Sequence, residues 1–164
     1  MSEIIIRTAE MSDLDAVSRI ESACFPAAEA ASREEFAERL RFYANRFLLL
    51  FADGKLVSFA DGFVTDEADL RDEMYENASL HNENGAWQMI FGVNTLPEYR
   101  GRGYAGRLIR QMTENARAEG RKGVVLTCKK EKIRWYESLG FTNEGESRSV
   151  HGGVTWYQMR LRFD

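Results

Sequence analysis

Residues 93–108 read VNTLPEYRGRGYAGRL, and this stretch decides the expected fold. The apolar start predicts the end of a strand, the middle a glycine-rich turn, and the last residues the first turns of a helix. Glycines let the backbone approach an anion closely, and the unpaired N–H groups of a first helical turn point towards it. The helix dipole adds about half a positive charge at that end. The stretch therefore predicts a site for a phosphate or a pyrophosphate.

The spacing of the three glycines narrows the kind of phosphate. Gly101, Gly103 and Gly106 nearly reproduce the GxGxxG pattern of dinucleotide-binding domains. However, the turn does not follow the first expected strand, and the next strand ends in lysines instead of an acidic residue. The Gly-Lys-Ser/Thr of a P-loop is absent from the turn. The stretch therefore fits the pattern of a dinucleotide-binding domain poorly. A tight turn with a purely structural role remains an alternative to a phosphate site.

Hydrophobic spacing outside this stretch predicts alternating strands and helices. The expected strands are 4–6, 47–52, 56–64, 86–93, 123–128, 141–144 and 154–163. The expected helices follow Ser12 up to Phe25-Pro26, follow the capping box that opens at Ser32, and cover 104–116 and 133–139, with a short surface helix within 66–85. Asp53-Gly54 predicts a hairpin turn. The order predicts an α/β (α+β) domain with a mixed sheet and helices on its faces.

Length and composition indicate one ordinary domain covering residues 1–164. The chain has 44% apolar and 29% charged residues, close to globular averages. The longest apolar run, 47–52, is far shorter than the roughly 18 residues of a membrane span, and the first residues lack the basic start of a signal peptide. The spacing of the two cysteines indicates neither a zinc site nor a disulfide framework. We expect a cytoplasmic protein without a bound metal.

The net charge of −4 conceals two halves of opposite sign. Residues 1–99 hold 19 acidic and 8 basic side chains, a balance of −11, whereas residues 100–164 hold 7 and 14, a balance of +7. The sign changes at Arg100, inside the predicted phosphate turn. The pattern indicates two binding regions of opposite sign, although solvated faces sorted by chance would produce it too. No interleaved basic and aromatic pattern predicts nucleic-acid binding.

Two motifs together resemble the GCN5-related N-acetyltransferases (GNAT). Residues 100–105, RGRGYA, match the Arg/Gln-x-x-Gly-x-Gly/Ala signature of that superfamily. Residues 135–141, WYESLGF, match its second hallmark, a tyrosine on a short helix before Gly-Phe. Cys24-Phe25-Pro26 and the length of the chain are also similar, so the resemblance covers the whole chain. It implies the GNAT fold, a central mixed, mostly antiparallel sheet of six to seven strands flanked by about four helices.

Within the superfamily the sequence looks most like the arylalkylamine (serotonin) branch. Residues 125–128 followed by Tyr136, and the Leu80-His81 segment before the fourth strand, carry this likeness. The animal enzymes of the branch have two histidines that are implicated in taking the amine proton. Met89 and Phe91 stand at the matching positions here, and neither accepts a proton. Neither the indolethylamine substrate nor that proton route carries over.

The resemblance implies direct transfer of an acetyl group from acetyl-CoA to a primary amine. Tyr136 would be the catalytic acid that protonates the departing thiolate, because a phenol stays protonated at neutral pH. An amide of Phe91, Gly92 or Val93 would polarise the thioester carbonyl. The backbone of Val93 and Thr95 would pair with the pantetheine arm. The further cofactor-binding positions would be Asn94 between them, Arg100, Gly101, Arg102, Gly103, Tyr104, Ala105 and Gly106 at the pyrophosphate, and Thr127.

The acceptor and the group that removes its proton are less defined. The acidic first part favours a small cationic amine, because acidic walls concentrate it. The candidate bases are His81, Glu83, Glu29, Asp66 and His151. Alternatives are a protein N-terminus or a lysine as acceptor, an inactive acyl-CoA-binding sensor, and a nucleotide-binding regulatory module. A homodimer is possible, and neither a membrane nor a nucleic acid is an expected partner.

Overall fold

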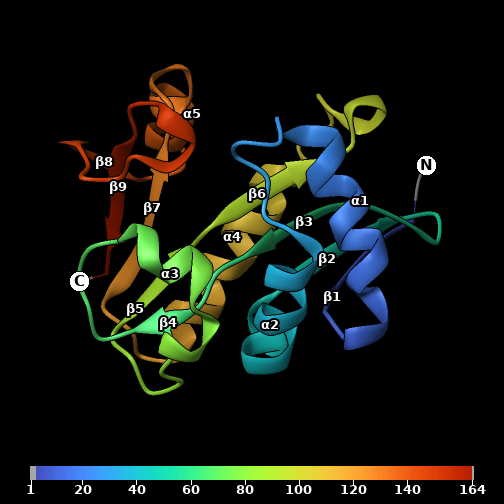
Figure 1. Cartoon of the computed structure of the whole chain (residues 1–164), viewed down its shortest axis with the longest axis horizontal. Coiled ribbons are helices and arrows are strands. Elements are labelled where there is room, and N and C mark those ends of the chain that lie inside the picture. Colours follow the sequence, from blue (N-terminus) through green and yellow to red (C-terminus); the bar gives the residue numbers. More distant parts are fainter. Residues whose placement is uncertain (1–2, 164) are drawn as a thin grey trace.

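The computed structural model describes residues 3–163, and its strands form two connected sheets (Figure 1). The strands are β1 (Ile4–Thr8), β2 (Leu48–Ala52), β3 (Lys55–Asp61), β4 (Val64–Thr65), β5 (Trp87–Ile90), β6 (Gly92–Thr95), β7 (Gly123–Cys128), β8 (Thr142–Glu146) and β9 (Tyr157–Arg162). The helices are α1 (Leu14–Cys24), α2 (Arg33–Tyr43), α3 (Asp72–Glu76), α4 (Tyr104–Ala118) and α5 (Ile133–Ser138), with short 3-10 turns between elements.

The order of the strands is β1-β2-β3-β6 in one sheet and β4-β5-β7-β9-β8 in the other. Every pair is antiparallel except β5 and β7, which run parallel with α4 as the crossover between them. A parallel pair needs such a crossover, and the hydrophobic stripe of α4 packs back onto the sheet. The mixed, mostly antiparallel α+β architecture predicted from the sequence is confirmed.

Two of the predicted strands are long segments that break at the same level. Residues 56–64 divide into β3 and β4, and residues 86–93 divide into β5 and β6. The segments stay paired across the break, where the Phe91 amide donates to the Asp61 carbonyl at 2.7 Å and the Met89 amide donates to the Phe63 carbonyl at 2.8 Å. The nine strands of the described residues therefore correspond to the seven predicted ones, because a kink divides each of two predicted strands into a pair.

Gly62 explains why the kink forms where it does. A Cβ atom on Gly62 would lie 1.9 Å from the carbonyl oxygen of Met89, so the two backbones approach more closely than any larger residue permits. Glycine inside a strand commonly marks such a bulge or close approach. The kink turns β6 away from the second sheet, and β6 and β7 diverge beyond it (Figure 1).

Helices cover both faces of the sheet. On one face α1 and α2 bury Val17, Ile20 and Phe36 against Leu49 and Phe59. On the other face α4 and α5 pack against the residues that alternate with these, including Leu48, Leu50, Val57, Val124 and Leu126. Alternation along each strand therefore divides the core into two layers. Burying each large aliphatic or aromatic side chain contributes about 1.5–3 kcal/mol, so these layers fix the positions of the strand ends.

The local signals for helix ends hold with one correction. The Ser32 side chain accepts from the Glu35 amide and Glu35 accepts from the Ser32 amide, so the predicted capping box is present. Ser12 is not the cap of the first helix. Asp13 stands at that position, and its carboxylate accepts from the Glu10 amide at 2.8 Å.

In residues 3–163 no helix has the length and apolar character needed to cross a membrane.

Candidate active site

Two neighbouring cavities open where β6 and β7 separate. The first, about 500 Å³, follows β6 to the glycine-rich turn and the start of α4. The second, about 280 Å³, lies between α1, α2 and the end of β7. Both are lined by Cys24, Phe25, Val93, Lys132 and Tyr136. The first cavity is called the turn cavity below, and the second the acidic cavity.

The turn cavity ends on the backbone that the sequence predicted to bind a phosphate. Gly101 and Gly103 adopt φ angles of +80° and +82°, in the left-handed region that favours glycine. Gly103 is also the residue that caps α4. The Arg107 amide is the first of the helix to bond back, donating to the Gly103 carbonyl at 3.1 Å. The amides of the preceding helical turn therefore lie at the cavity with no helical acceptor, as an anion site requires.

Nine of the predicted cofactor-binding residues line the turn cavity: Val93, Asn94, Thr95, Arg100, Gly101, Gly103, Tyr104, Ala105 and Gly106. The Asn94 side chain points into the protein, so its contribution is limited to the backbone. Arg100 donates to the Thr95 carbonyl at 3.1 Å. The same carbonyl accepts the Cys24 thiol at 3.3 Å.

Two predicted residues lie elsewhere. Arg102 turns away from the turn cavity, places its guanidinium 4.9 Å from the centre of the Tyr99 ring and donates to the Glu98 carbonyl. Thr127 lies in the acidic cavity, where its hydroxyl is 3.1 Å from that of Tyr75. Trp135 lines the turn cavity beside Tyr136 and was not predicted, although its place in the WYESLGF motif was a usable signal.

Tyr136 stands at the junction of the two cavities. Helix α5 holds its ring edge-on to Trp135 and Phe141, with centroids 4.8 and 5.8 Å away. Burial, together with the Cys128 thiol and the Tyr75 phenol nearby, raises the pKa of Tyr136 well above that of a free phenol. The side chain therefore remains a protonated acid across the neutral range.

The acidic cavity has charged and aromatic walls. Glu21, Glu29, Glu35 and Glu131 contribute carboxylates, and Arg39, Lys129 and Lys132 contribute cations. Lys129 and Glu29 form an ion pair at 2.7 Å on the rim. His151 donates from Nε2 to the Glu29 carbonyl oxygen, 2.8 Å away, and its ring stacks on that of Tyr75 with centroids 5.1 Å apart. Phe25, Phe91 and Trp156 supply apolar wall.

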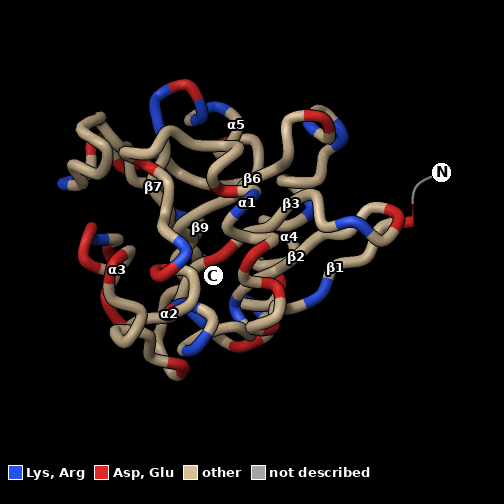
Figure 2. Tube along the Cα trace, turned by 45° about the vertical axis from the view of Figure 1, so that its right-hand side comes forward, with Lys and Arg blue, Asp and Glu red and all other residues tan. Residues whose placement is uncertain are grey.

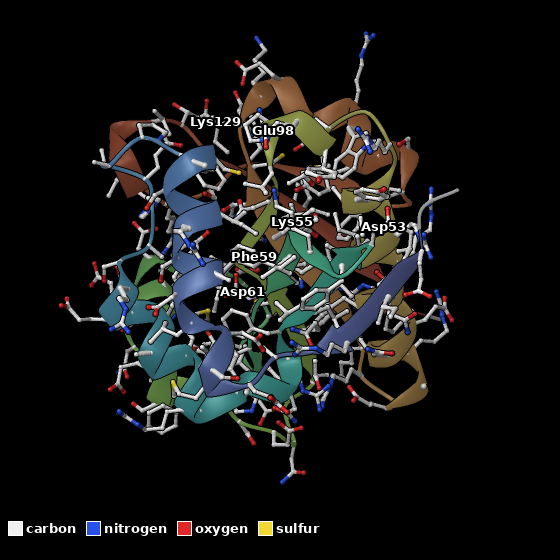
Figure 3. The ribbon with its side chains drawn as sticks, turned by 90° about the vertical axis from the view of Figure 1, so that its right-hand side faces the viewer. Asp53, Lys55, Phe59, Asp61, Glu98 and Lys129 are labelled. Carbon is white, nitrogen blue, oxygen red and sulfur yellow. The ribbon has the colours of Figure 1, made fainter. Side chains whose placement is uncertain are left out.

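A buried charge cluster lies behind the acidic cavity. Arg39 donates to Asp61 at 3.1 Å and to the Tyr75 carbonyl at 3.0 Å. In Figure 3 Asp61 lies near the middle of the molecule, whereas Lys129 lies towards the upper end. Glu21 accepts from the Ala31 amide at 2.8 Å and from the Asn94 amide group at 2.6 Å. Burial raises the pKa of Glu21 and of Asp61, the latter to about 7 although Arg39 acts against it.

Sequence reasoning missed Glu21 and Arg39, although the pattern contained a signal. Glu21 lies four residues after Val17 and three before Cys24, which places it on the apolar stripe of α1. Arg39 lies three residues after Phe36, on the buried face of α2. Charged residues on a buried helix face are rare unless they are paired or functional. The spacing alone therefore indicated that both residues were candidates for a site.

The candidate bases fall into two groups. His81, Glu83 and Asp66 line neither cavity, and their side chains make hydrogen bonds that stabilise the fold. His81 accepts the Val64 amide at Nδ1, so its neutral form donates from Nε2 to Glu83, and Asp66 accepts the Ala86 amide. Glu29 and His151 do line the acidic cavity. The described residues contain no group of three or more side chains suited to a metal ion.

The distribution of charge follows the two cavities in part. Acidic positions predominate around α3, and basic positions occur on the loops before α5 and around the glycine-rich turn (Figure 2). Lys129 is not a free cation, since Glu29 neutralises it. The opposite signs of the two parts of the sequence therefore meet at the site instead of forming two separate faces.

The described residues thus combine a splayed strand with a helix N-terminus whose first amides lack helical acceptors, a geometry suited to a phosphate-bearing ligand. The family model described as "Acetyltransferase (GNAT) family" matches residues 14–141. The chain belongs to this family and is an acetyl-CoA-dependent N-acetyltransferase, an acyltransferase. A comparison with curated proteins found no match.

Solved structures share the fold at low sequence identity. The loading GNATL domain of CurA from Lyngbya majuscula is 18% identical, with 98% of each chain covered and a TM-score of 0.83. The GphF GNAT-like decarboxylase in complex with isobutyryl-CoA is 22% identical, with 96% of this chain and 98% of that chain covered, and also has a TM-score of 0.83. The ribosomal-protein-S18-alanine N-acetyltransferase from Escherichia coli is 21% identical, with 98% and 94% covered and a TM-score of 0.73.

Proposed function

We propose that the enzyme transfers the acetyl group of acetyl-CoA to the primary amine of a small cationic acceptor by direct attack. The observation that carries this proposal is the meeting of the two cavities at Tyr136, Cys24 and Val93. A donor in the turn cavity and an acceptor in the acidic cavity would place their reacting ends at this junction. Holding two reactants in this way supplies much of the rate of a transfer reaction.

The donor lies along β6 and the glycine-rich turn in this account. The backbone of Val93 and Thr95 pairs with the pantetheine arm, since β6 has β3 on one side and diverges from β7 on the other. The turn from Arg100 to Gly106 cradles the pyrophosphate. The amide of Val93 polarises the thioester carbonyl, because alternation along β6 turns the amides of Gly92 and Asn94 towards β3. The Phe91 amide does not contribute, because it donates to the Asp61 carbonyl.

Tyr136 is the proposed acid. Attack of the neutral amine on the thioester carbon forms a tetrahedral intermediate, and cleavage of the C–S bond releases the CoA thiolate. The phenol of Tyr136 gives its proton to the sulfur and is reprotonated by the ammonium proton of the intermediate. Because its pKa is raised, the Tyr136 phenol stays protonated until the thiolate forms. The acidic cavity, which Tyr136 also lines, would place the amine beside this phenol.

The walls of the acidic cavity support a cationic acceptor of small size. Its four carboxylates outnumber its three cations, and the buried Asp61 behind it adds a further acidic group. A cavity of about 280 Å³ suits a small amine with an apolar or aromatic body that packs on Phe25 and Phe91.

The likeness to the arylalkylamine branch stays a prediction, as do a single domain, a homodimer and a cytoplasmic location.

Acetylation of a protein N-terminus is the second candidate. The similar S18-alanine N-acetyltransferase from Escherichia coli makes a peptide acceptor relevant. The contact between His151 and Glu29 forms part of the wall of the acidic cavity, whose volume is about 280 Å³. A cavity of this size favours a small amine over a peptide.

The test is release of the CoA thiol from acetyl-CoA with two matched panels. One panel holds mono- and diamines with aliphatic or aromatic bodies, and the other holds short peptides with free N-termini or lysines. We expect turnover with at least one amine and a kcat/KM for it at least ten times that for any peptide. Turnover restricted to peptides would replace the acceptor class, and acetyl-CoA binding without any turnover would favour the sensor.

A further inference from the structure

We propose that Glu21 is the group that takes the proton from the acceptor amine. This inference rests on the proposed function, because it assigns a role at the same site. Glu21 comes from α1 and lines the acidic cavity together with Gly92, Val93 and Tyr136. The proposed base and the proposed acid therefore face one cavity from opposite sides of the strand opening.

The position of the Glu21 carboxylate beside the strand kink supports this role. A Cβ atom on Gly92 would lie 3.9 Å from the Oε1 atom of Glu21 and 3.2 Å from the Oδ1 atom of Asp61. Gly92 is the first residue of β6 and directly precedes Val93, whose amide would polarise the thioester carbonyl. The carboxylate thus lies within one side chain's reach of the start of β6. A larger residue at 92 would fill the space between them.

The hydrogen bonds of Glu21 leave it able to accept a proton. One oxygen accepts from the Ala31 amide and the other from the Asn94 amide group, and both donors are neutral. Each carboxylate oxygen has two acceptor sites, so each keeps one for an amine. Of the other carboxylates of the cavity, Glu29 pairs with the cation of Lys129, Glu35 closes the capping box at Ser32, and Glu131 is exposed to solvent.

The charges that face Glu21 come from several elements. Arg39 and Glu35 lie on α2, Asp61 lies on β3, and Asn94 on β6 is neutral. Burial raises the pKa of Glu21, and Glu35 acts in the same direction, while Arg39 and the two hydrogen bonds act against them. The result is a carboxylate that is more basic than one in water, as a base near neutral pH requires.

The proton steps balance around the two residues. The cationic amine gives one proton to the Glu21 carboxylate, and its nitrogen lone pair then forms the C–N bond. When the C–S bond breaks, the thiolate takes the proton of Tyr136, and the second ammonium proton restores the phenol. Glu21 finally loses its proton to solvent. The products are the amide, CoA thiol and one released proton.

Glu21→Gln is the direct test, because the substitution keeps the shape of the side chain. The glutamine oxygen continues to accept from the Ala31 amide. Asn94 has a buried side-chain oxygen without a partner among the described residues, so a flip of its amide would let it accept from the new NH₂ group. The fold and the acetyl-CoA site should therefore survive. Glu114→Gln on α4, outside both cavities, is the matched control.

We expect kcat/KM for the amine to fall about 100-fold at pH 7 in Glu21→Gln, within the range of general-base effects, with KM for acetyl-CoA unchanged. The deficit should shrink as the pH rises towards the pKa of the free amine, near 10, because the substrate then arrives unprotonated. Glu114→Gln should match the parent enzyme. A purely structural role of Glu21 would give a deficit that does not change with pH.

The outcomes separate this inference from the proposed function. An active parent with an active Glu21→Gln variant overturns the role of Glu21, and loss of the rate in His151→Asn instead would assign the base to His151. If Glu21→Gln does not fold, Glu21→Asp and Glu21→Asn form a second pair of equal size, of which only the aspartate should retain activity at pH 7. A parent that acetylates no amine overturns the proposed function itself.

Discussion

The guanidinium of Arg39 lies 3.1 Å from the carboxylate of Asp61, and 4% and 1% of the two side chains are exposed. An ion pair this far from water gains little net stability, because desolvation of both charges offsets their attraction. Removing one partner is a different matter, since the other charge is left buried and unpaired. The pair also fixes the α2 wall of the acidic cavity through the bond from Arg39 to the Tyr75 carbonyl.

Arg39→Met should lower the free energy of unfolding by about 3–5 kcal/mol, because Asp61 loses its counter-ion. The double variant Arg39→Met/Asp61→Leu should recover part of this loss. The Tyr75 carbonyl would still lack its donor, at a cost of about 1–3 kcal/mol. Urea unfolding of both variants measures the difference. A double variant less stable than Arg39→Met would contradict the account of the pair.

Tyr136→Phe should lower kcat by about 100-fold and leave acetyl-CoA affinity within twofold, because the phenyl ring keeps the packing against Trp135 and Phe141. Steady-state kinetics and calorimetric titration of acetyl-CoA separate the two effects. Tyr104→Phe, a buried tyrosine at the start of α4, serves as a comparison of fold stability. Unchanged kcat in Tyr136→Phe would remove the acid from this position.

Gly103→Ala should weaken acetyl-CoA binding and cost about 1–2 kcal/mol of stability, because φ is +82° and the turn must rearrange to relieve the strain. Gly120→Ala is a matched control at φ +77°, and a Cβ meets nothing within 4 Å at either position. Both variants should lose similar stability in thermal unfolding. Only Gly103→Ala should raise the Kd for acetyl-CoA, and equal Kd values would argue against the pyrophosphate turn.

Acid should destabilise the protein below about pH 6.5 through His81. Burial lowers the pKa of His81 from 6.5, so the unfolded chain binds a proton before the folded chain does. The stability that the neutral ring provides is present above pH 6.5 and is lost as the pH falls through the lowered pKa. Thermal unfolding from pH 8 to 5 tests this, and His81→Gln should flatten the curve. A flat curve for the parent would contradict it.

Local signals predicted most of the fold because they depend on neighbouring residues. The stripe of Tyr104, Leu108 and Met112, the capping box at Ser32 and the turn at Asp53-Gly54 all appear as expected. The breaks within residues 56–64 and 86–93 were missed, although Gly62 and Gly92 stand at them. Such a glycine indicates a bulge only when the opposing backbone is known, and Met89 is 27 positions from Gly62.

The site was predictable where one segment builds it. Most residues of the turn cavity could be predicted from residues 93–106, because the strand, the turn and the start of the helix are contiguous in the sequence. The acidic cavity is assembled from α1, α2, β7 and the loop before β9, so its members are distant in sequence. The bond between Glu21 and Asn94 spans 73 positions. Only the tertiary fold brings such pairs together, and helical spacing alone indicated that Glu21 faces inward.

The most direct test of the account is mass spectrometry of the acceptor after incubation with acetyl-CoA that carries a deuterated acetyl group. We expect a small cationic amine to gain one labelled acetyl group on nitrogen, in equal amount to the CoA thiol released, and Tyr136→Phe to slow both together. Thiol release without a labelled amine would contradict acetyl transfer to such an acceptor. A label found only on peptides would contradict the proposed acceptor class.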